Sequence, residues 1–286
     1  MANMMLAWPN RFDGAALDQG EWVAEMPLDN LLDRVLAIKA RCLDTSYAHF
    51  RATLPSDYEI RAISLCNHNL SPTATYRITG GNDASFATYS YDSGWLDVWP
   101  IDKGASEWTW LEWEDDRFWV GTYSGESVEG YRASTVLLLN KPIRGKYWHV
   151  QIRDEGNFDG YIELGRVFLG PVWQPVYNLR YGAGIGWNSR TDIAEARSGT
   201  EYFDVKAAYR TLRGELKHMT TDEAMSQAFE SQRRMDVHGE MLFVYNPSDT
   251  LYMVYRAFLC RYRTLNQIEH PYWNDHSVPI ELKELL

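Results

Sequence analysis

The segment Tyr58–Gly81, YEIRAISLCNHNLSPTATYRITGG, decides the fold class. Its first part alternates polar and apolar residues, and its last part is rich in Thr, Tyr and Ile, as expected for half-buried β-strands. Ser71 and Pro72 form a turn signal between the two parts, and Gly80 and Gly81 end the second strand. A strand, a turn and a strand make the repeating unit of a β-sandwich.

The segments that flank this one carry the same β-type patterns. Residues 91–100, YDSGWLDVWP, almost alternate and place two tryptophans among carboxylates, which is typical of a sandwich edge that faces water or a neighbouring subunit. Residues 134–170 supply two or three more strands, separated by Gly, Asn and Asp. Because no long helical pattern precedes residue 200, the sequence predicts a mainly β fold that begins with a sandwich.

The chain of 286 residues is long enough for two domains, each with its own hydrophobic core. The residue composition changes after Pro171 and Pro175, where a glycine-rich segment leads into strands of polar and aromatic residues. Nine of the 12 tryptophans precede residue 169, so the two parts differ in composition. We therefore expect a β-sandwich domain over residues 1–168 and a second β-rich domain over residues 169–286.

One α-helix is expected in the second domain, over residues 221–236. Thr220 or Thr221 followed by Glu223 resembles a capping box, and Gly239 ends the run. The residues that fall on one helical face are Ala224, Met225, Ala228, Phe229 and Met235. Residues 240–262 then predict an apolar strand, an Asn-Pro-Ser-Asp turn and a second aromatic strand.

Composition argues against several classes of protein. The net charge is −11, and residues 1–168 hold 15 basic against 24 acidic side chains, so a nucleic-acid backbone would be repelled. No stretch approaches the ~18 apolar residues of a membrane helix, and the first residues lack the pattern of a signal peptide. Cys42, Cys66 and Cys260 form no zinc or disulfide motif and are expected to be buried thiols of a chain made in a reducing cytosol.

The glycine-rich segment YGAGIGW, residues 181–187, does not have the spacing of a phosphate-binding loop. Its glycines lie at 182, 184 and 186, and no helix pattern follows to direct amide groups at a phosphate. We expect a turn or a loop that contacts another subunit.

The segment DEGNFDGYIELGR, residues 154–166, matches a calcium-binding loop only in part. Four positions fit the register: Glu155, Asn157, Asp159 and Gly160. Arg166 occupies the position that needs a bidentate carboxylate, and no helix flanks the segment. The sequence favours a turn capped by Asx side chains, with a different oxygen-ligand site in this loop as the alternative.

No catalytic signature is present. The sequence has no G-x-S-x-G motif, and His68, after an alternating strand, is expected to be a hydrogen-bonded strand-end residue. A glycosidase needs two carboxylates at a set separation, and EWEDD, residues 112–116, supplies acids beside tryptophans, although a solvated acidic loop is the favoured interpretation. We predict no catalytic, cofactor-binding or metal-binding residue.

Aromatic density is the most unusual feature of the first domain. Exposed indole rings among acids suit the apolar faces and hydroxyls of sugars as well as a protein interface, while buried rings would fill a sandwich core. We expect core packing to account for at least half of the cluster. The candidate glycan or subunit contacts are Trp95, Trp99, Trp108, Trp110, Trp113 and Trp119.

Taken in order, six segments resemble a family of tail proteins of long-tailed bacteriophages, of the distal-tail or tail-tip kind. The resemblance covers most of the chain from Trp8 onward and is weakest in residues 100–140 and at the C-terminal end. The segments are MPLDNLLD (26–33), IRAISLCNHNLSPTATYRI (60–78), YDSGWLDVWP (91–100), YWHVQIRDEGNFDGYIELGRVFLGPVWQP (147–175), YGAGIGW (181–187) and FDVKAAYRTLRGEL (203–216).

This resemblance implies a galactose-binding-like, discoidin-type β-sandwich followed by a tail-completion β domain with one helix. It also implies a structural virion component, made and assembled in the host cytoplasm, that forms a ring joining the tail tube to the tip. Its partners would be further copies of itself, as a hexamer or a trimer, and the tail tube, tape measure and baseplate hub. The Tyr and Arg side chains suited to such interfaces are Tyr209, Arg210, Arg256, Arg261 and Tyr262.

The alternative function is a carbohydrate-binding or glycan-cleaving protein that acts on host cell-surface polysaccharide. In that case the sandwich presents the tryptophan cluster to the glycan. The main expectation is a structural tail protein with no enzymatic activity and closed homo-oligomers.

Overall fold

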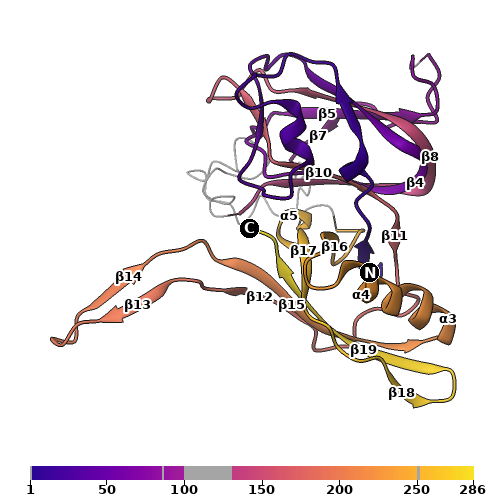
Figure 1. Ribbon diagram of the computed structural model, residues 1–286, viewed down its shortest axis with the longest axis vertical. Coiled ribbons are helices and arrows are strands. Elements are labelled where there is room, and N and C mark those ends of the chain that lie inside the picture. Colours follow the sequence, from indigo (N-terminus) through magenta and orange to yellow (C-terminus); the bar gives the residue numbers. More distant parts are fainter. Residues whose placement is uncertain (1, 86, 100–130, 250–251) are drawn as a thin grey trace, which may run out of the picture. The chain divides into compact units, whose positions relative to one another are not determined.

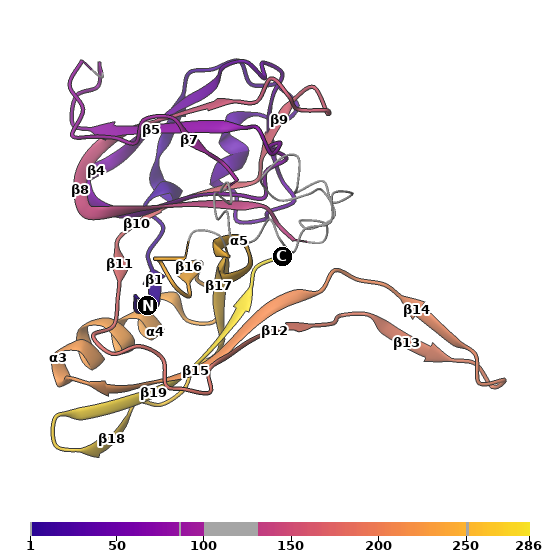
Figure 2. The same ribbon diagram turned by 180° about the vertical axis from the view of Figure 1, so that it is seen from behind.

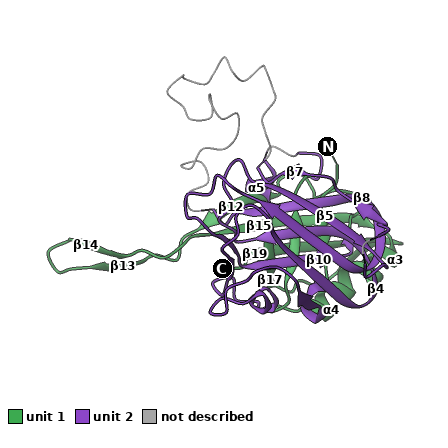
Figure 3. Cartoon of the chain, turned by 90° about the horizontal axis from the view of Figure 1, so that it is seen from above, with its two compact units in different colours: residues 1–8, 173–246, 258–286 green, residues 9–172, 247–257 purple. Residues whose placement is uncertain are grey.

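The computed structural model describes residues 2–85, 87–99, 131–249 and 252–286, and these residues are mainly β as expected. The chain forms two compact units, coloured separately in Figure 3. Unit 1 contains residues 1–8, 173–246 and 258–286, and unit 2 contains residues 9–172 and 247–257. The boundary expected near residue 169 lies close to the division at 172/173. The expected bounds are wrong at two places: residues 1–8 belong to the C-terminal unit, and residues 247–257 belong to unit 2, so unit 2 consists of two segments that interrupt unit 1.

Two long antiparallel strands organise unit 2: β4 (Ala48–Cys66) and β8 (Ser134–Arg153). Their register shifts between Thr53 and Tyr58 and again between Ile60 and Ala62. A shift of this kind bends a strand and increases its twist. The two halves of each strand therefore lie in different layers of one β-sandwich, and Figure 1 shows both strands curving between the layers.

Different strands extend the two layers. The first half of β4 and the second half of β8 pair with β2 (Ala16–Asp18) and β5 (Thr75–Gly81). The short strands β6 (Tyr91–Asp92) and β7 (Leu96–Asp97) pair with β5, so residues 91–97 form an edge of this first layer, as expected. The second half of β4 pairs with β10 (Arg166–Gly170) in the second layer. Strands β3 (Ala40–Cys42) and β9 (Ile162–Leu164) pair with each other in a separate two-stranded sheet.

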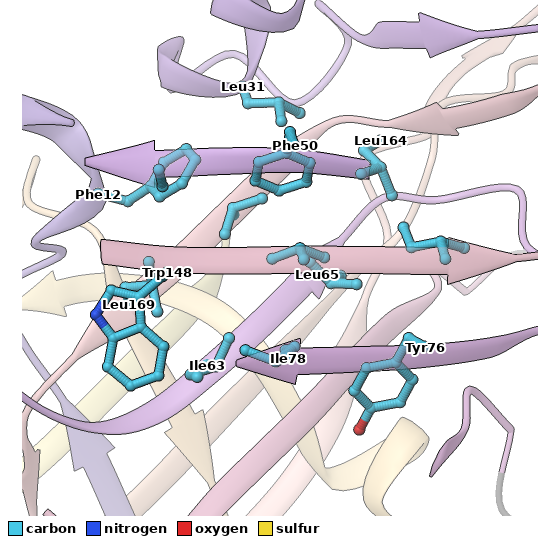
Figure 4. Close-up of a cluster of buried hydrophobic side chains, with 14 of the residues drawn as sticks. Phe12, Leu31, Phe50, Ile63, Leu65, Tyr76, Ile78, Trp148, Leu164 and Leu169 are labelled. Carbon is cyan, nitrogen blue, oxygen red and sulfur yellow. The ribbon is translucent and has the colours of Figure 1, made fainter. Parts of the chain in front are cut away.

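A single hydrophobic core lies between the layers of unit 2. Phe50, Ile78 and Trp148 point inward from the first layer, and Ile63 and Leu169 point inward from the second (Figure 4). Successive residues of a strand point to opposite faces, which explains the alternation of the sequence. Burial of each such side chain contributes about 1.5–3 kcal/mol.

In the described part of the chain, unit 1 is built on an eight-stranded sheet. Its order is β11 (Val172–Trp173), β1 (Met5–Ala7), β16 (Met241–Val244), β17 (Ala257–Thr264), β19 (Asp275–Glu284), β15 (Tyr209–Met219) and β12 (Gly184–Asn188), with β18 (Glu269–Tyr272) paired to β19. The turn and strand expected after β16 also contain a short helix, α5 (Met253–Arg256), in unit 2.

The expected helix of unit 1 is present but is not uniform. It comprises α3 (Thr221–Glu223), a π-helical segment (Ala224–Phe229) and α4 (Glu230–Met235). The Thr220 side chain accepts a hydrogen bond from the Glu223 N–H at 3.2 Å, which confirms the cap. None of the described helices is long and apolar enough to span a membrane.

The predicted apolar face of this helix is wrong in one respect. Ala224 and Ala228 are buried against the sheet, whereas Met225 and Phe229 are exposed. Two alanines allow the helix backbone to approach the sheet closely, and the bulkier neighbours lie beside that contact and outside the core.

Candidate functional site

A β-ribbon extends from the sheet of unit 1. Strands β12 and β15 continue past the sheet into β13 (Asp192–Glu195) and β14 (Glu201–Asp204), which pair with each other and with no other strand among the described residues. Gly199 has a φ of 82° in the connecting turn, a conformation that glycine adopts without strain. We call residues 191–206 the arm, and Figures 1 and 2 show it leaving the sheet at the end opposite α3.

The arm carries apolar side chains that nothing in the described chain covers. Ile193 and Phe203 face each other across the two strands and are 62% and 56% exposed. Tyr202 and Val205 are also exposed. An isolated two-stranded ribbon has no core of its own, so these side chains gain stability only when another surface covers them.

The arm also carries an unusual charge arrangement. The four acidic residues of β13 and β14 are accompanied by no basic residue in either strand. Lys206 pairs with Asp192 and Asp204 near the base of the arm. Glu195 lies directly opposite Glu201 near the tip, and like charges in this position repel each other.

The YGAGIGW segment leads into the arm and is not a simple loop. Gly182 has a φ of 98° and forms the turn, but Gly184–Asn188 are strand β12, paired with β15 at the edge of the sheet. The prediction of a turn or loop was therefore only half right, because cross-strand pairing overrides the low strand propensity of glycine.

A groove lies elsewhere on unit 1, between the helix and the segment that joins β17 to β18. It measures about 490 Å³, and its apolar lining residues include Met225, Phe229, Leu265 and Ile268. Gln232 Nε2 donates to the Asn266 carbonyl oxygen at 3.0 Å, which ties the helix to this segment.

The outward face of the first layer of unit 2 is a second candidate surface. It carries two charged pairs: Arg51 Nε donates to Asp18 at 2.8 Å, and Arg77 Nε donates to Asp92 at 2.9 Å. The Arg77 guanidinium lowers the pKa of the Asp92 carboxyl. We call this surface the polar face.

Polar and aromatic side chains fill the middle of the polar face. The rings of His49 and His149 lie 5.7 Å apart, and Gln151 Nε2 lies 2.6 Å from the Tyr47 hydroxyl. Burial, with the charges of His49 and the arginines, lowers the pKa of His149 to about 4. Thr79 is only 3% exposed, and among the described residues its hydroxyl has no hydrogen-bond partner. The side-chain oxygen of Gln151 likewise has no hydrogen-bond partner among the described residues.

The structure accounts for two of the six candidate tryptophans. Trp99 is buried in the core of unit 2, where its Nε1 donates to the Leu70 carbonyl oxygen at 3.0 Å, so it does not form a contact surface. Trp95 is partly buried under the Arg153 guanidinium, 4.0 Å from the ring centroid. Trp108, Trp110, Trp113 and Trp119, like the acids of residues 112–116, lie outside the described residues.

Two of the five candidate interface residues are interior instead. Arg210 is buried and pairs with Glu284, and the buried Tyr262 hydroxyl bonds to Ser231 Oγ at 2.8 Å. Each finds a polar partner within its own unit, so neither side chain is available to a neighbour. The other three candidates, Tyr209, Arg256 and Arg261, remain partly exposed.

His68, the loop of residues 154–166 and the three cysteines have the structural roles that the sequence favoured. His68 is buried, and its Nδ1 accepts from the Leu70 N–H at 3.3 Å, so Nε2 carries the proton toward Thr135 Oγ1 at 3.0 Å. Asp159 N–H donates to Asn157 Oδ1 in an Asx turn. Among the described residues, no group of three or more His, Cys, Asp or Glu side chains could hold a metal ion. The three cysteines are free and buried.

A scan against protein-family models finds no match, and neither does a search of curated proteins. Similar solved structures include CBM32-1 from a family 31 glycoside hydrolase of Clostridium perfringens, at 12% identity and a TM-score of 0.37, over 57% of this chain and 97% of that one. The family 32 CBM of C. perfringens NanJ in complex with galactose matches at 9% identity and a TM-score of 0.38, over 59% and 99%.

A Streptococcus pneumoniae fucose-binding module, SpX-3, matches at 11% identity and a TM-score of 0.37, over 57% of this chain and 98% of that one. At these identities and TM-scores, the likeness identifies neither a ligand nor a partner of the chain.

Proposed function

We propose that the protein is a non-enzymatic structural subunit that assembles with copies of itself through the arm. The arm is the observation that supports this proposal, because it exposes Ile193, Phe203 and Val205 on a ribbon with two unpaired edges. Natural proteins usually protect such edges, since they invite pairing with another chain. Covering each exposed apolar side chain would contribute about 1.5–3 kcal/mol to association.

The resemblance to distal-tail proteins implies where this assembly would take place. A ring at the end of a phage tail is built from identical subunits that must hold their neighbours without a covalent link. We therefore place the protein in the virion tail, assembled in the host cytoplasm, with the tail tube, the tape measure and the baseplate hub as its partners.

Removal of the arm tests the proposal. A variant in which an Asn-Gly turn replaces residues 191–206 keeps the described core of unit 1, including Leu212, Leu216 and Phe243. We expect the full chain to form a closed oligomer by light scattering and negative-stain imaging, and the variant to be a folded monomer. An oligomer of unchanged mass in the variant would contradict the role of the arm, and a full chain that stays monomeric would contradict self-assembly.

Saccharide binding is the second candidate function, and the polar face favours it. The middle of this face carries the partly exposed side chains of Tyr47, His49 and Gln151. Arg51 and Arg77 are already paired with carboxylates, so a neutral ligand suits this face better than an anion. Hydroxyl groups of a sugar could bond to these side chains, because they both donate and accept hydrogen bonds.

Titration with methyl glycosides of galactose, glucose, mannose and N-acetylglucosamine tests this second function. We expect at least one glycoside to bind, and Gln151→Leu to weaken that binding at least tenfold while the thermal midpoint stays unchanged. Gln174→Leu, at a partly exposed glutamine of unit 1, is the control. Absence of binding at millimolar glycoside, or equal binding by both variants, would overturn it.

A further inference from the structure

The groove on unit 1 and the arm have complementary surfaces. One face of the arm combines the apolar pair Ile193 and Phe203 with the acidic pair Glu195 and Glu201, since residues two apart on a strand share a face. The groove is apolar at Met225 and Phe229, and Phe229 is 54% exposed. Each surface therefore leaves apolar side chains uncovered.

The segments around the two surfaces carry opposite net charges. The arm holds four acidic residues and two basic residues, Arg197 and Lys206. Lys206 pairs with Asp192 and Asp204, so Glu195 and Glu201 are the acids that it leaves.

The two segments that border the groove, residues 230–235 and 261–270, hold four arginines and two glutamates. Arg233 and Arg234 pair with Glu230 but keep about half or more of their side-chain surface exposed, at 62% and 48%. Arg233 follows the groove residue Phe229 by four positions and lies on the same side of the helix, so its guanidinium would relieve the repulsion between Glu195 and Glu201 of a docked arm.

A chain cannot place its arm in its own groove. The arm leaves the sheet of unit 1 at the end opposite α3, while the groove lies beside the helix that α3 begins (Figures 1 and 2). The occupant must then belong to another molecule. A second copy of this chain is the partner whose surface has the required chemistry.

We infer that the groove lined by Met225, Phe229, Leu265 and Ile268 receives the arm of a neighbouring copy. This inference rests on the proposed self-assembly and names its receiving surface. The contact joins two different surfaces, so it is head-to-tail, and repetition of such a contact produces a closed ring or an open filament. The arm and the groove lie on one unit, so each copy both gives and receives one contact.

Two blocking variants test this inference. Phe203→Asp places a charge on the arm, and Phe229→Asp places one in the groove; both side chains are exposed, so neither change disturbs a core. We expect each variant alone to be monomeric, with a wild-type thermal midpoint. An equimolar mixture should form one-to-one dimers and nothing larger, because one intact arm meets one intact groove. Phe158→Asp, at a fully exposed site of unit 2, should assemble like the wild type.

The outcomes separate this inference from the proposed function. If Phe203→Asp blocks assembly but Phe229→Asp assembles normally, the arm docks elsewhere and the inference fails while self-assembly stands. A mixture that yields no dimer likewise overturns it. If the wild-type chain itself never exceeds a monomer, the proposed function fails as well.

Discussion

Arg210 and Glu284 form an ion pair in the interior of unit 1, with 2.5 Å between Arg210 Nη2 and Glu284 Oε1. Glu284 also accepts from the Arg210 backbone N–H at 2.7 Å, and the guanidinium lies 4.8 Å from the centre of the Phe258 ring. Removal of one partner leaves the other charge buried. We expect Glu284→Leu and Arg210→Met each to lower the free energy of unfolding by about 3–5 kcal/mol.

The double variant Arg210→Met/Glu284→Leu distinguishes this explanation from lost packing. Because it removes both charges, it should regain most of the stability lost in either single variant. Urea unfolding of all four proteins measures the coupling. Additive losses in the double variant would mean that the pair is not what holds these residues in the interior.

Gly80 lies against Trp148 in the core of unit 2. A Cβ atom at Gly80 would come within 2.5 Å of two carbons of the Trp148 ring. We expect Gly80→Ala to cost about 1–3 kcal/mol, because the ring cannot yield inside a packed core. Gly186→Ala, on strand β12, is the matched control, since a Cβ atom there meets nothing within 4 Å. In thermal unfolding, Gly80→Ala should have a clearly lower midpoint than Gly186→Ala. Equal midpoints would contradict the close contact between Gly80 and Trp148.

His68 makes the stability of unit 2 depend on pH. Burial lowers its pKa to about 3, against about 6.5 in an unfolded chain. Below pH 6.5 the His68 side chain binds a proton in the unfolded state but not in the folded state. The free energy of unfolding therefore falls as the pH falls toward 3. We expect a loss on the order of 2 kcal/mol between pH 6.5 and 4.5.

Comparison with His68→Gln isolates this effect from other titrating groups. The difference in unfolding free energy between wild type and variant should change by that amount over the same pH range. A constant difference for His68→Gln would show that His68 titrates normally in the fold.

His276 is a histidine buried in the interior of unit 1. It is 2% exposed, and among the described residues neither ring nitrogen has a hydrogen-bond partner. An unsatisfied buried polar group costs about 1–3 kcal/mol, and leucine has a similar volume without that cost. His276→Leu should therefore raise the free energy of unfolding by about 1 kcal/mol in urea titrations. A loss of stability would mean that the contact with the His270 ring, 4.1 Å away, matters more.

Much of the sandwich could be predicted because its signal is local. In β5, Tyr76 and Ile78 face the core while Arg77 faces outward, and the sequence alternates accordingly. The cap at Thr220 is equally local, since it depends on two residues three positions apart. The division into units was harder to predict, because Met5 pairs with Val244 and no local sequence pattern indicates a pairing between residues so far apart.

The candidate sites were predicted less well, for two physical reasons. Arg210 and Tyr262 have the composition of an interface, but their partners Glu284 and Ser231 are distant in sequence and hold them inside. The arm has four-residue strands of mixed polarity, and only their pairing distinguishes them from a loop. The exposed Ile193 and Phe203, so close in sequence to four acidic residues, were the signal that could have identified the arm.

The place of β1 in unit 1 has a consequence for synthesis on the ribosome. Leu242 to Val244 of β16, which pair with Met5, Leu6 and Ala7, emerge long after residues 9–172 and after β11, the other neighbour of β1 in the sheet. At about 5–20 residues per second, the first strand waits roughly 10–50 seconds for them. During that interval the apolar side chains of β1 lack their β16 partners and are open to a chaperone, although most of unit 2 has already emerged.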